Sequence, residues 1–171
     1  GQAPEPIAKN LNPFSKFIKN NGEIAAGLAT DGDADRIGLF DEKGDFVDSH
    51  HILLLLLLYL HKYKSMNGKV VVAASTTPRV VKLAEMWGLE HDTVQIGFKH
   101  IAQQMINEDV LIGGEESGGI AIKGHIPERD GIWMGLVIFE YMAKSGKSLT
   151  SLIKEIYELV GEFKYWRDDL H

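Results

Sequence analysis

The 171-residue sequence contains no cysteine, and its 18 lysines and arginines are outnumbered by 24 aspartates and glutamates. The absence of cysteine excludes disulfides, thiolate metal sites and thiol nucleophiles. The net charge of −6 argues against a nucleic-acid partner, because nucleic-acid binders usually present a basic face. The acidic excess is also too small to indicate disorder.

The sequence also lacks an apolar run long enough to cross a membrane. Its most apolar stretch, residues 52–60, has nine residues and includes six consecutive leucines, whereas a membrane-spanning helix needs about 20. We interpret this stretch as a fully buried helix and expect no membrane partner. No secretory signal is visible, and together with the lack of cysteine this favours a cytoplasmic protein.

The proportions of apolar (44%) and charged (25%) residues are typical of a soluble globular domain. From residue 48 onwards, strand-like and helix-like segments alternate. We expect strands at residues 70–74, 91–96, 110–113, 120–123 and 163–167, and helices at residues 48–64, 77–88, 99–107, 130–144 and 148–160. Such alternation predicts an α/β fold with a mixed, largely parallel sheet flanked by helices.

The first 46 residues predict only part of a domain. Asn12 followed by Pro13 predicts a capped helix start. The remaining signals are a helix stop at 21–22, strands at 24–29 and 36–40, a turn at 41–44 and a short returning strand at 46–47. These elements are too few to close a core. We therefore expect the end of a larger α/β domain, with an unpaired strand edge at 24–29.

Three polar, glycine-containing loops follow predicted strands, at residues 30–36, 97–99 and 113–119. Ligands of open α/β sheets bind beyond the carboxyl ends of the strands. These loops are therefore the first candidates for a functional site.

The loop at 30–36 contains three aspartates at alternate positions, Asp31, Asp33 and Asp35. Carboxylates so close repel one another unless a cation lies between them, and oxygen ligands select a hard ion such as magnesium or calcium. A helix–loop–helix calcium site fits poorly, because its sixth position is Arg36 instead of glycine and its flanks predict strands. A solvated acidic turn is the simplest non-functional alternative. Arg36 can hold phosphate oxygens beside a metal, which indicates phosphoryl chemistry.

These motifs resemble those of the α-D-phosphohexomutases, the phosphoglucomutase and phosphomannomutase family. Residues 30–36, Thr-Asp-Gly-Asp-Ala-Asp-Arg, resemble the family's magnesium loop, and residues 114–119, Gly-Glu-Glu-Ser-Gly-Gly, resemble its sugar-binding loop. Smaller agreements occur at residues 4–6, 97–99 and 125–131. The two main motifs are long and stand in the family's order, and the resemblance covers nearly the whole chain.

The resemblance also implies a domain organisation. Family members have four domains. Residues 1–46 would form the C-terminal part of domain 2 with the metal loop, residues 47–165 would form domain 3 with the sugar loop, and residues 166–171 would lead towards domain 4. No segment resembles the loop with the phosphorylated serine or the phosphate-binding loop of domain 4. We therefore expect a fragment whose partners include the remaining domains of the same parent chain.

The activity implied by the resemblance is interconversion of hexose 1-phosphate and hexose 6-phosphate. It proceeds through a phosphoserine and a hexose 1,6-bisphosphate, which serves as intermediate and activator. Mg²⁺ is the implied cofactor and a phosphorylated hexose the implied substrate. Gly119 stands where some phosphomannomutases and phosphoglucosamine mutases have a histidine, which favours glucose as the sugar, with mannose as the alternative. The isolated chain is expected to be inactive, because the phosphoserine and the phosphate-binding domain are absent.

The resemblance assigns roles to particular residues. Asp31, Asp33 and Asp35 would hold the metal, and Arg36 would be the catalytic residue that steadies the transferred phosphate or the substrate's oxygen. The substrate-binding candidates are Glu115, Ser117, Gly97, Lys99, Arg129 and His125. Glu116 should point away because of strand alternation. Each candidate has an ordinary alternative, such as a polar turn for the Glu115 loop, a surface lysine for Lys99 and a solvated loop residue for His125.

Two other functions stay open at this point. A stand-alone module that binds metal and sugar phosphate without catalysis would suit a natural protein of this length. A calcium-stabilised structural domain would show a larger rise in melting temperature with calcium than with magnesium.

Overall fold

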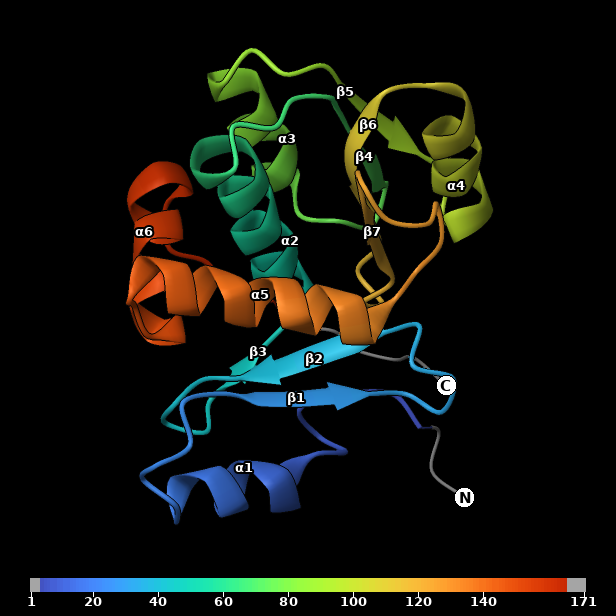
Figure 1. Cartoon of the computed structure of the whole chain (residues 1–171). Helices are drawn as coiled ribbons and strands as arrows, with labels where there is room; N and C mark the ends of the chain where they lie inside the picture. Colours follow the sequence, from blue (N-terminus) through green and yellow to red (C-terminus); the bar gives the residue numbers. More distant parts are fainter. Residues whose placement is uncertain (1–3, 166–171) are drawn as a thin grey trace.

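The computed structural model describes residues 4–165 of the chain. It contains two sheets that share one hydrophobic core (Figure 1). The elements in chain order are α1 (Asn12–Lys19), β1 (Gly27–Thr30), β2 (Ile37–Phe40), β3 (Phe46–Val47), α2 (Ser49–Leu58), η1 (Tyr59–Tyr63), β4 (Lys69–Ala73), α3 (Pro78–Met86), β5 (His91–Val94), α4 (Phe98–Asn107), β6 (Val110–Gly114), β7 (Ile120–Ile122), α5 (Gly131–Ser145) and α6 (Leu149–Val160).

The first sheet has the order β1-β2-β3, and both of its pairings are antiparallel. Helices α1 and α5 cover opposite faces of it (Figure 1). Phe14 and Ile18 of α1 lie against Gly27 on one face, while Leu28 lies against Gly135 of α5 on the other. A single-layer sheet of three short strands is thus held between helices that come from distant parts of the chain.

The second sheet has the order β5-β4-β6-β7, with β4 parallel to β5 and β6, and β7 antiparallel to β6. Residues of β4 alternate between its two faces, as strand geometry requires. Val71 packs with Phe98 and Ile101 of α4, whereas Val70 and Val72 join the larger core with α2, α3, α5 and α6. The prediction of a mixed, largely parallel sheet flanked by helices is therefore confirmed.

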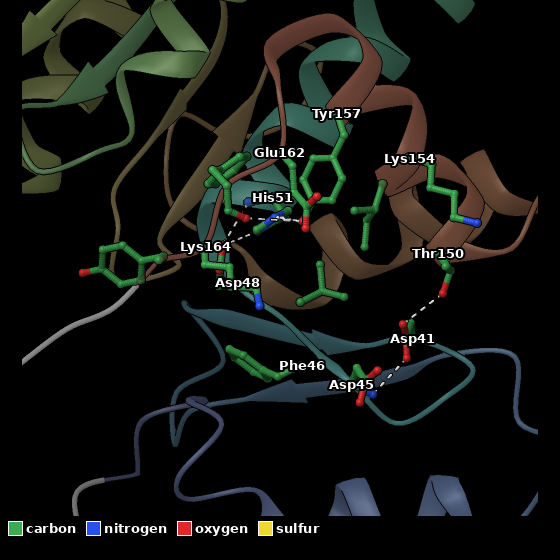
Figure 2. A pocket seen from close by; sticks show the side chains of 14 residues that line it. Asp41, Asp45, Phe46, Asp48, His51, Thr150, Lys154, Tyr157, Glu162 and Lys164 are labelled. Atoms are coloured by element: carbon green, nitrogen blue, oxygen red, sulfur yellow. Dashed lines mark hydrogen bonds and ion pairs between the residues drawn. The ribbon is translucent and has the colours of Figure 1, made fainter.

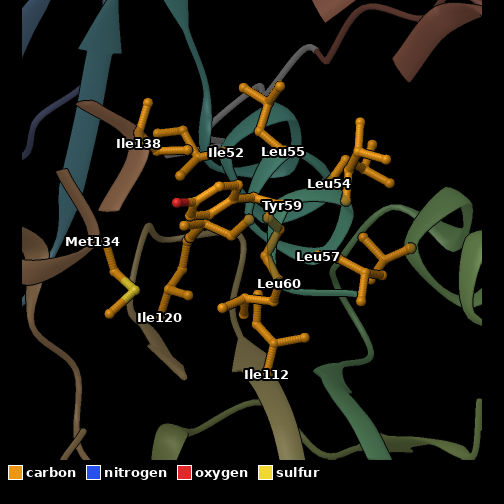
Figure 3. Close-up of a cluster of buried hydrophobic side chains, with 14 of the residues drawn as sticks. Ile52, Leu54, Leu55, Leu57, Tyr59, Leu60, Ile112, Ile120, Met134 and Ile138 are labelled. Atoms are coloured by element: carbon orange, nitrogen blue, oxygen red, sulfur yellow. The ribbon is translucent and has the colours of Figure 1, made fainter. Parts of the chain in front are cut away.

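The leucine run forms the centre of the larger core. Every residue of Ile52–Leu60 is buried. In Figure 3, Tyr59 and Leu60 lie towards β6, β7 and α5, whereas Leu54, Leu55 and Leu57 point to other sides of the helix. The helix begins at Asp48, whose carboxylate accepts from His51 N at 3.1 Å. The prediction of a fully buried helix is confirmed.

Five local features differ from the predictions. Residues 24–26, expected to begin a strand, lie before the start of β1. The N-cap of α1 is Leu11, which makes no side-chain cap, and not Asn12. Residues 59–63 form a π-helical turn after α2, which the apolar pattern does not indicate. Residues 95–96, expected to continue a strand, lie beyond the end of β5. The strand expected at 163–167 is absent from 163–165, and the rest of it lies outside the described residues.

Within residues 4–165, no helix combines the length and the apolar character needed to span a bilayer.

Candidate active site

The three candidate loops lie side by side where the two sheets meet. Arg36 and Gly119 form an antiparallel bridge, and Ile37 N donates to Gly118 O at 3.1 Å. The third loop joins through Gly97, whose N–H donates to Glu115 Oε1 at 3.0 Å. Loops that are far apart in the sequence therefore form one polar cluster.

The aspartates of the first loop converge. Asp31, Asp33 and Asp35 each offer a carboxylate oxygen, and these three oxygens lie within 4.8 Å of one another. The turn that directs them inward includes Ala34 in the left-handed region, at φ +62°. Such a conformation costs a residue other than glycine about 1 kcal/mol, and it is held by hydrogen bonds to Asp31 and Gly131.

Arg36 fixes Asp31, the most buried of the three at 8% exposure. Its Nε donates to Asp31 Oδ2 at 2.5 Å and its backbone N donates to Oδ1 at 3.2 Å. Burial works to raise the pKa of Asp31, but the hydrogen bonds and charge of Arg36 hold that pKa below its ordinary value. Asp31 is therefore kept ionised, as a metal ligand must be.

Arg129, from the loop before α5, pairs with Asp35 in the same way. Its Nη2 lies 2.6 Å from Asp35 Oδ2. Burial raises the pKa of Asp35; Arg129 opposes that rise, and the neighbouring charge of Asp31 adds to it. The pKa of Asp35 therefore stays above its ordinary value although an arginine is bound to this carboxylate.

These observations fit a hard divalent cation. The three donors are all carboxylate oxygens, they are closely spaced, and their mutual repulsion is only partly offset by two arginines. Magnesium and calcium prefer such ligands.

Glu115 is the centre of the second part of the cluster. It is only 6% exposed, and burial raises its pKa even though the N–H of Gly97 favours the ionised form. Ser117 is half-buried two residues further on.

Between the loops, the backbone passes so closely that a Cβ on Gly118 would lie 2.7 Å from Ile37 O. Glycine at this position, with φ +97°, permits the contact between the sheets.

Gly119 leaves the space that Arg129 occupies. A Cβ at this position would collide with Arg129 Cδ and would lie 3.4 Å from Glu115 Oε2. The Arg129 guanidinium also lies over the Phe98 ring, 5.5 Å from its centroid. Arg129 thus connects the aspartate loop, the glutamate loop and the start of α4.

Glu116 points to the other side of its loop, but not because of strand alternation: β6 ends at Gly114 and Glu116 lies in the turn that follows. Its carboxylate accepts from Ser75 Oγ after β4, and its carbonyl accepts from Ser49 Oγ of α2 at 2.5 Å. These two serines anchor the loop that carries Glu115 and Ser117.

Two predicted substrate ligands lie at the margin of the cluster. Lys99 is exposed in the first turn of α4, next to Gly97. His125 Nε2 is 2.8 Å from Asp130 Oδ2, and its ring stacks on Trp133 with centroids 4.7 Å apart. The contacts of His125 therefore lead to the start of α5, and none joins it to the aspartates or to Glu115.

A cavity of about 650 Å³ lies elsewhere, between β3, the start of α2 and the end of α6 (Figure 2). Its polar lining includes an Asp48–His51–Tyr157 series, with His51 Nδ1 2.8 Å from Asp48 and Nε2 2.9 Å from the Tyr157 hydroxyl. None of the predicted site residues lines this cavity.

Sequence reasoning missed several members of the cluster. Glu5 lies 3.4 Å from Arg36 Nη1, and Phe98 supports Arg129. Glu5 stands between two prolines in a segment that resembles the family, but nothing in the sequence joins it to Arg36. Phe98 had no polar signal and would pass as an ordinary core residue.

Comparison with known proteins places the chain in a family. Residues 48–160 match the family model of phosphoglucomutase/phosphomannomutase, alpha/beta/alpha domain III. This range falls inside residues 47–165, the range predicted for domain 3, although the boundaries themselves stay a prediction.

The chain is 34% identical to the phosphoglucosamine mutase of Rubrobacter xylanophilus, over 94% of this chain and 37% of that protein. It is 31% identical to the phosphoglucomutase/phosphomannomutase of Thermococcus kodakarensis, over 90% and 33%. The solved structure of a candidate phosphomannomutase from Thermus thermophilus superposes with a TM-score of 0.87 at 39% identity, over 92% and 36%. The chain thus spans about a third of the length of these relatives. It belongs to the phosphoglucomutase/phosphomannomutase family of phosphohexomutases and carries that family's α/β/α domain III.

Proposed function

We propose that this chain supplies the metal-binding and sugar-binding loops of a magnesium-dependent phosphohexomutase that interconverts hexose 1-phosphate and hexose 6-phosphate. The main support is the direct pairing of the aspartate loop with the Glu115 loop through Arg36 and Gly119. A cation site beside a hydroxyl-binding site suits a substrate that is both a phosphate and a sugar.

Asp31, Asp33 and Asp35 would hold Mg²⁺. A bound cation supplies positive charge that stabilises a phosphoryl group during transfer. Arg36 fixes the orientation of Asp31, and Arg129 does the same for Asp35. Because a guanidinium presents a planar fork to phosphate oxygens, both arginines can also contact the phosphate.

Glu115 and Ser117 would bind sugar hydroxyls. A carboxylate accepts from hydroxyls and a serine both donates and accepts. Gly97 N holds one oxygen of Glu115, so the orientation of the carboxylate is set before a sugar arrives. Lys99 and Arg129 add positive charge near the substrate, whereas His125 acts indirectly by holding Asp130 at the start of α5.

Glucose phosphates are the substrates we expect, with mannose phosphates as the alternative. The phosphoglucosamine mutases among the relatives make glucosamine phosphate a necessary third comparison. The test is to measure kcat/KM for the three sugar phosphates with the complete parent enzyme. A preference for glucosamine phosphate would overturn the sugar and leave the mutase proposal intact.

The metal can be tested on this chain alone by titration calorimetry with Mg²⁺. Asp33→Asn should weaken Mg²⁺ binding by roughly tenfold or more, because it removes one charged ligand from the triad. Asp109→Asn is the matched control, since Asp109 is exposed and pairs with Lys123 away from the loop. Tighter binding of Ca²⁺ than of Mg²⁺, with no effect of Asp33→Asn on Mg²⁺, would contradict the metal assignment.

Catalysis requires the remaining domains in this proposal. The purified chain should not convert glucose 1-phosphate to glucose 6-phosphate, whereas the complete parent should, and Asp31→Asn in the parent should abolish the conversion. Turnover by the purified chain would overturn the fragment proposal. Tight binding of hexose phosphate by the chain, combined with an inactive parent, would favour a binding module.

A further inference from the structure

Glu116 carries a half-buried carboxylate that is not paired with a cation. Within residues 4–165, no lysine or arginine lies within ion-pair distance of it, and its Oε2 accepts from Ser75 Oγ in the loop after β4. The adjacent residue, Glu115, is a second carboxylate. Neighbouring carboxylates repel each other, so the hydrogen bond from Ser75 has to hold Glu116 in place. Hydrogen bonds to a charged acceptor are the stronger kind.

The backbone beside Glu116 is held by hydroxyl groups as well. Ser49 Oγ, at the start of α2, donates to Glu116 O at 2.5 Å. Thr76 Oγ1, which is buried, donates to Gly114 O at 3.5 Å. Residues 114–116 are thus fixed by hydroxyl groups from two separate parts of the chain, the start of α2 and the loop between β4 and α3.

The turn between β6 and β7 is closed by its own backbone. Gly118 N donates to Glu115 O at 3.2 Å, and Glu115 N donates to Gly119 O at 3.0 Å. A shift of Glu116 would therefore carry Glu115 with it, because both residues belong to the same closed turn.

Glu115 is the residue whose direction this arrangement sets. Its Oε1 accepts from Gly97 N at 3.0 Å. Its Oε2 makes no hydrogen bond within the described residues and lies on the side of Gly119. That second oxygen is free to accept from a hydroxyl.

We propose that Glu116 is a positioning residue for Glu115: held by Ser75 and Ser49, it fixes the turn so that one Glu115 oxygen binds Gly97 N and the other faces a sugar hydroxyl. The sugar in this inference rests on the proposed function, whereas the positioning is a property of the chain without substrate. The contacts that carry it lie wholly within residues 48–160, the range that matches domain III, so none of them involves either end of the chain.

The first test is amide hydrogen exchange of Gly97 in the 171-residue chain, measured by NMR without substrate. Gly97 N donates to Glu115 Oε1, so its exchange rate reports where that carboxylate lies. Glu116→Ala and Ser75→Ala should each raise the rate by about tenfold, as expected for the loss of a hydrogen bond to a charged group. Glu116→Gln should stay close to the wild type, because its amide oxygen still accepts from Ser75.

Ser145→Ala is the matched control. Ser145 is also half-buried, and its hydroxyl contacts Met142 O and Lys147 N at the end of α5. This variant should leave the exchange of Gly97 unchanged. Wild-type exchange in Glu116→Ala and Ser75→Ala would overturn the proposal. Equal acceleration in Glu116→Gln would overturn it too, because the charge of Glu116 and not its hydrogen bond would then be responsible, and equal acceleration in Ser145→Ala would show a general loss of stability instead.

The second test is kinetic and uses the complete parent enzyme. Glu116→Ala should raise KM for the sugar phosphate by about tenfold and leave the Mg²⁺ concentration that gives half-maximal activity unchanged. A general structural defect would shift both, since the two loops pair directly through Arg36 and Gly119. An unchanged KM would overturn the role of Glu116 towards the sugar. A wild-type parent that is inactive on every hexose phosphate would instead overturn the proposed function, and the exchange of Gly97 would still decide whether Glu116 positions Glu115.

Discussion

Single residues in the candidate site depend on the space that their neighbours leave. Arg129 reaches Asp35 only because Gly119 has no side chain in its path. Gly119→Ala should therefore displace Arg129 and destabilise the fold by about 1–3 kcal/mol, the usual cost of overpacking. Urea unfolding measures this change. Gly22→Ala, which adds a methyl group with no atom within 4 Å, should alter stability by less than about 0.5 kcal/mol. Equal effects of the two substitutions would contradict the packing argument.

At the scale of single residues, His50 should make the stability of the folded protein depend on pH. Its Nδ1 accepts from Thr77 N at 3.2 Å, and its Nε2 is buried with no hydrogen-bond partner. Burial lowers the pKa of His50 below the ordinary value of about 6.5. The unfolded chain then binds the proton more readily, so this contribution to stability is complete above that value and is lost as the pH falls through the folded pKa.

The comparison that isolates this effect is His50→Gln, which keeps an acceptor for Thr77 N but does not titrate. Thermal unfolding between about pH 8 and pH 5 should show a smaller loss of stability in the variant than in the wild type. Parallel curves for the two proteins would show that His50 contributes nothing to the acid side of the profile.

At the scale of elements, α2 connects the core to the site. Leu53 lies against Gly114 at the end of β6, where the glutamate loop begins. Leu53→Ala should destabilise the protein by about 2–5 kcal/mol, the range for large-to-small changes in a core. Ile106→Ala, on the exposed side of α4, should change stability by less than about 0.5 kcal/mol. Chemical denaturation of both variants tests whether the leucine run supports the site.

Elements with local signals were predictable from sequence. Asp48, Thr77, Asp130 and Ser148 each stand at the first position of a predicted helix, and each accepts a hydrogen bond from the first turn. The π-helical turn at 59–63 was missed because no local rule signals it; it coincides with contacts of Tyr59 and Tyr63 with Tyr141 on α5. The strand prediction is wrong for 163–165 because side-chain packing replaces strand pairing there, with Phe163 stacked on His51.

The same distinction applies to the candidate site. The aspartate loop was predictable because its three aspartates lie at alternate positions within one turn. The pairing of Arg129 with Asp35, and the anchoring of Glu116 by Ser49 and Ser75, depend on contacts between distant segments. No spacing in the sequence indicates such contacts.

At the scale of the whole molecule, the two sheets share a core. Ile37, Leu39 and Val47 of the first sheet belong to the same buried cluster as α2, β4 and β6. The chain should therefore unfold in one cooperative transition. Hydrogen exchange should give the β2 amides and the β6 amides similar opening free energies. Earlier opening of β2 would show that residues before 48 are a separate, weakly held unit.

The crossing of backbone between the sheets has a consequence for protein engineering. The predicted domain boundary near residue 46 divides the chain in sequence. In space, three backbone contacts join the two sides of it: Arg36 with Gly119, Ile37 with Gly118, and Ala34 with Gly131. A chimera that joins two family members at this point would assemble the candidate site from two unmatched parents. Recombination between relatives should therefore succeed only when both sides of these contacts are inherited together.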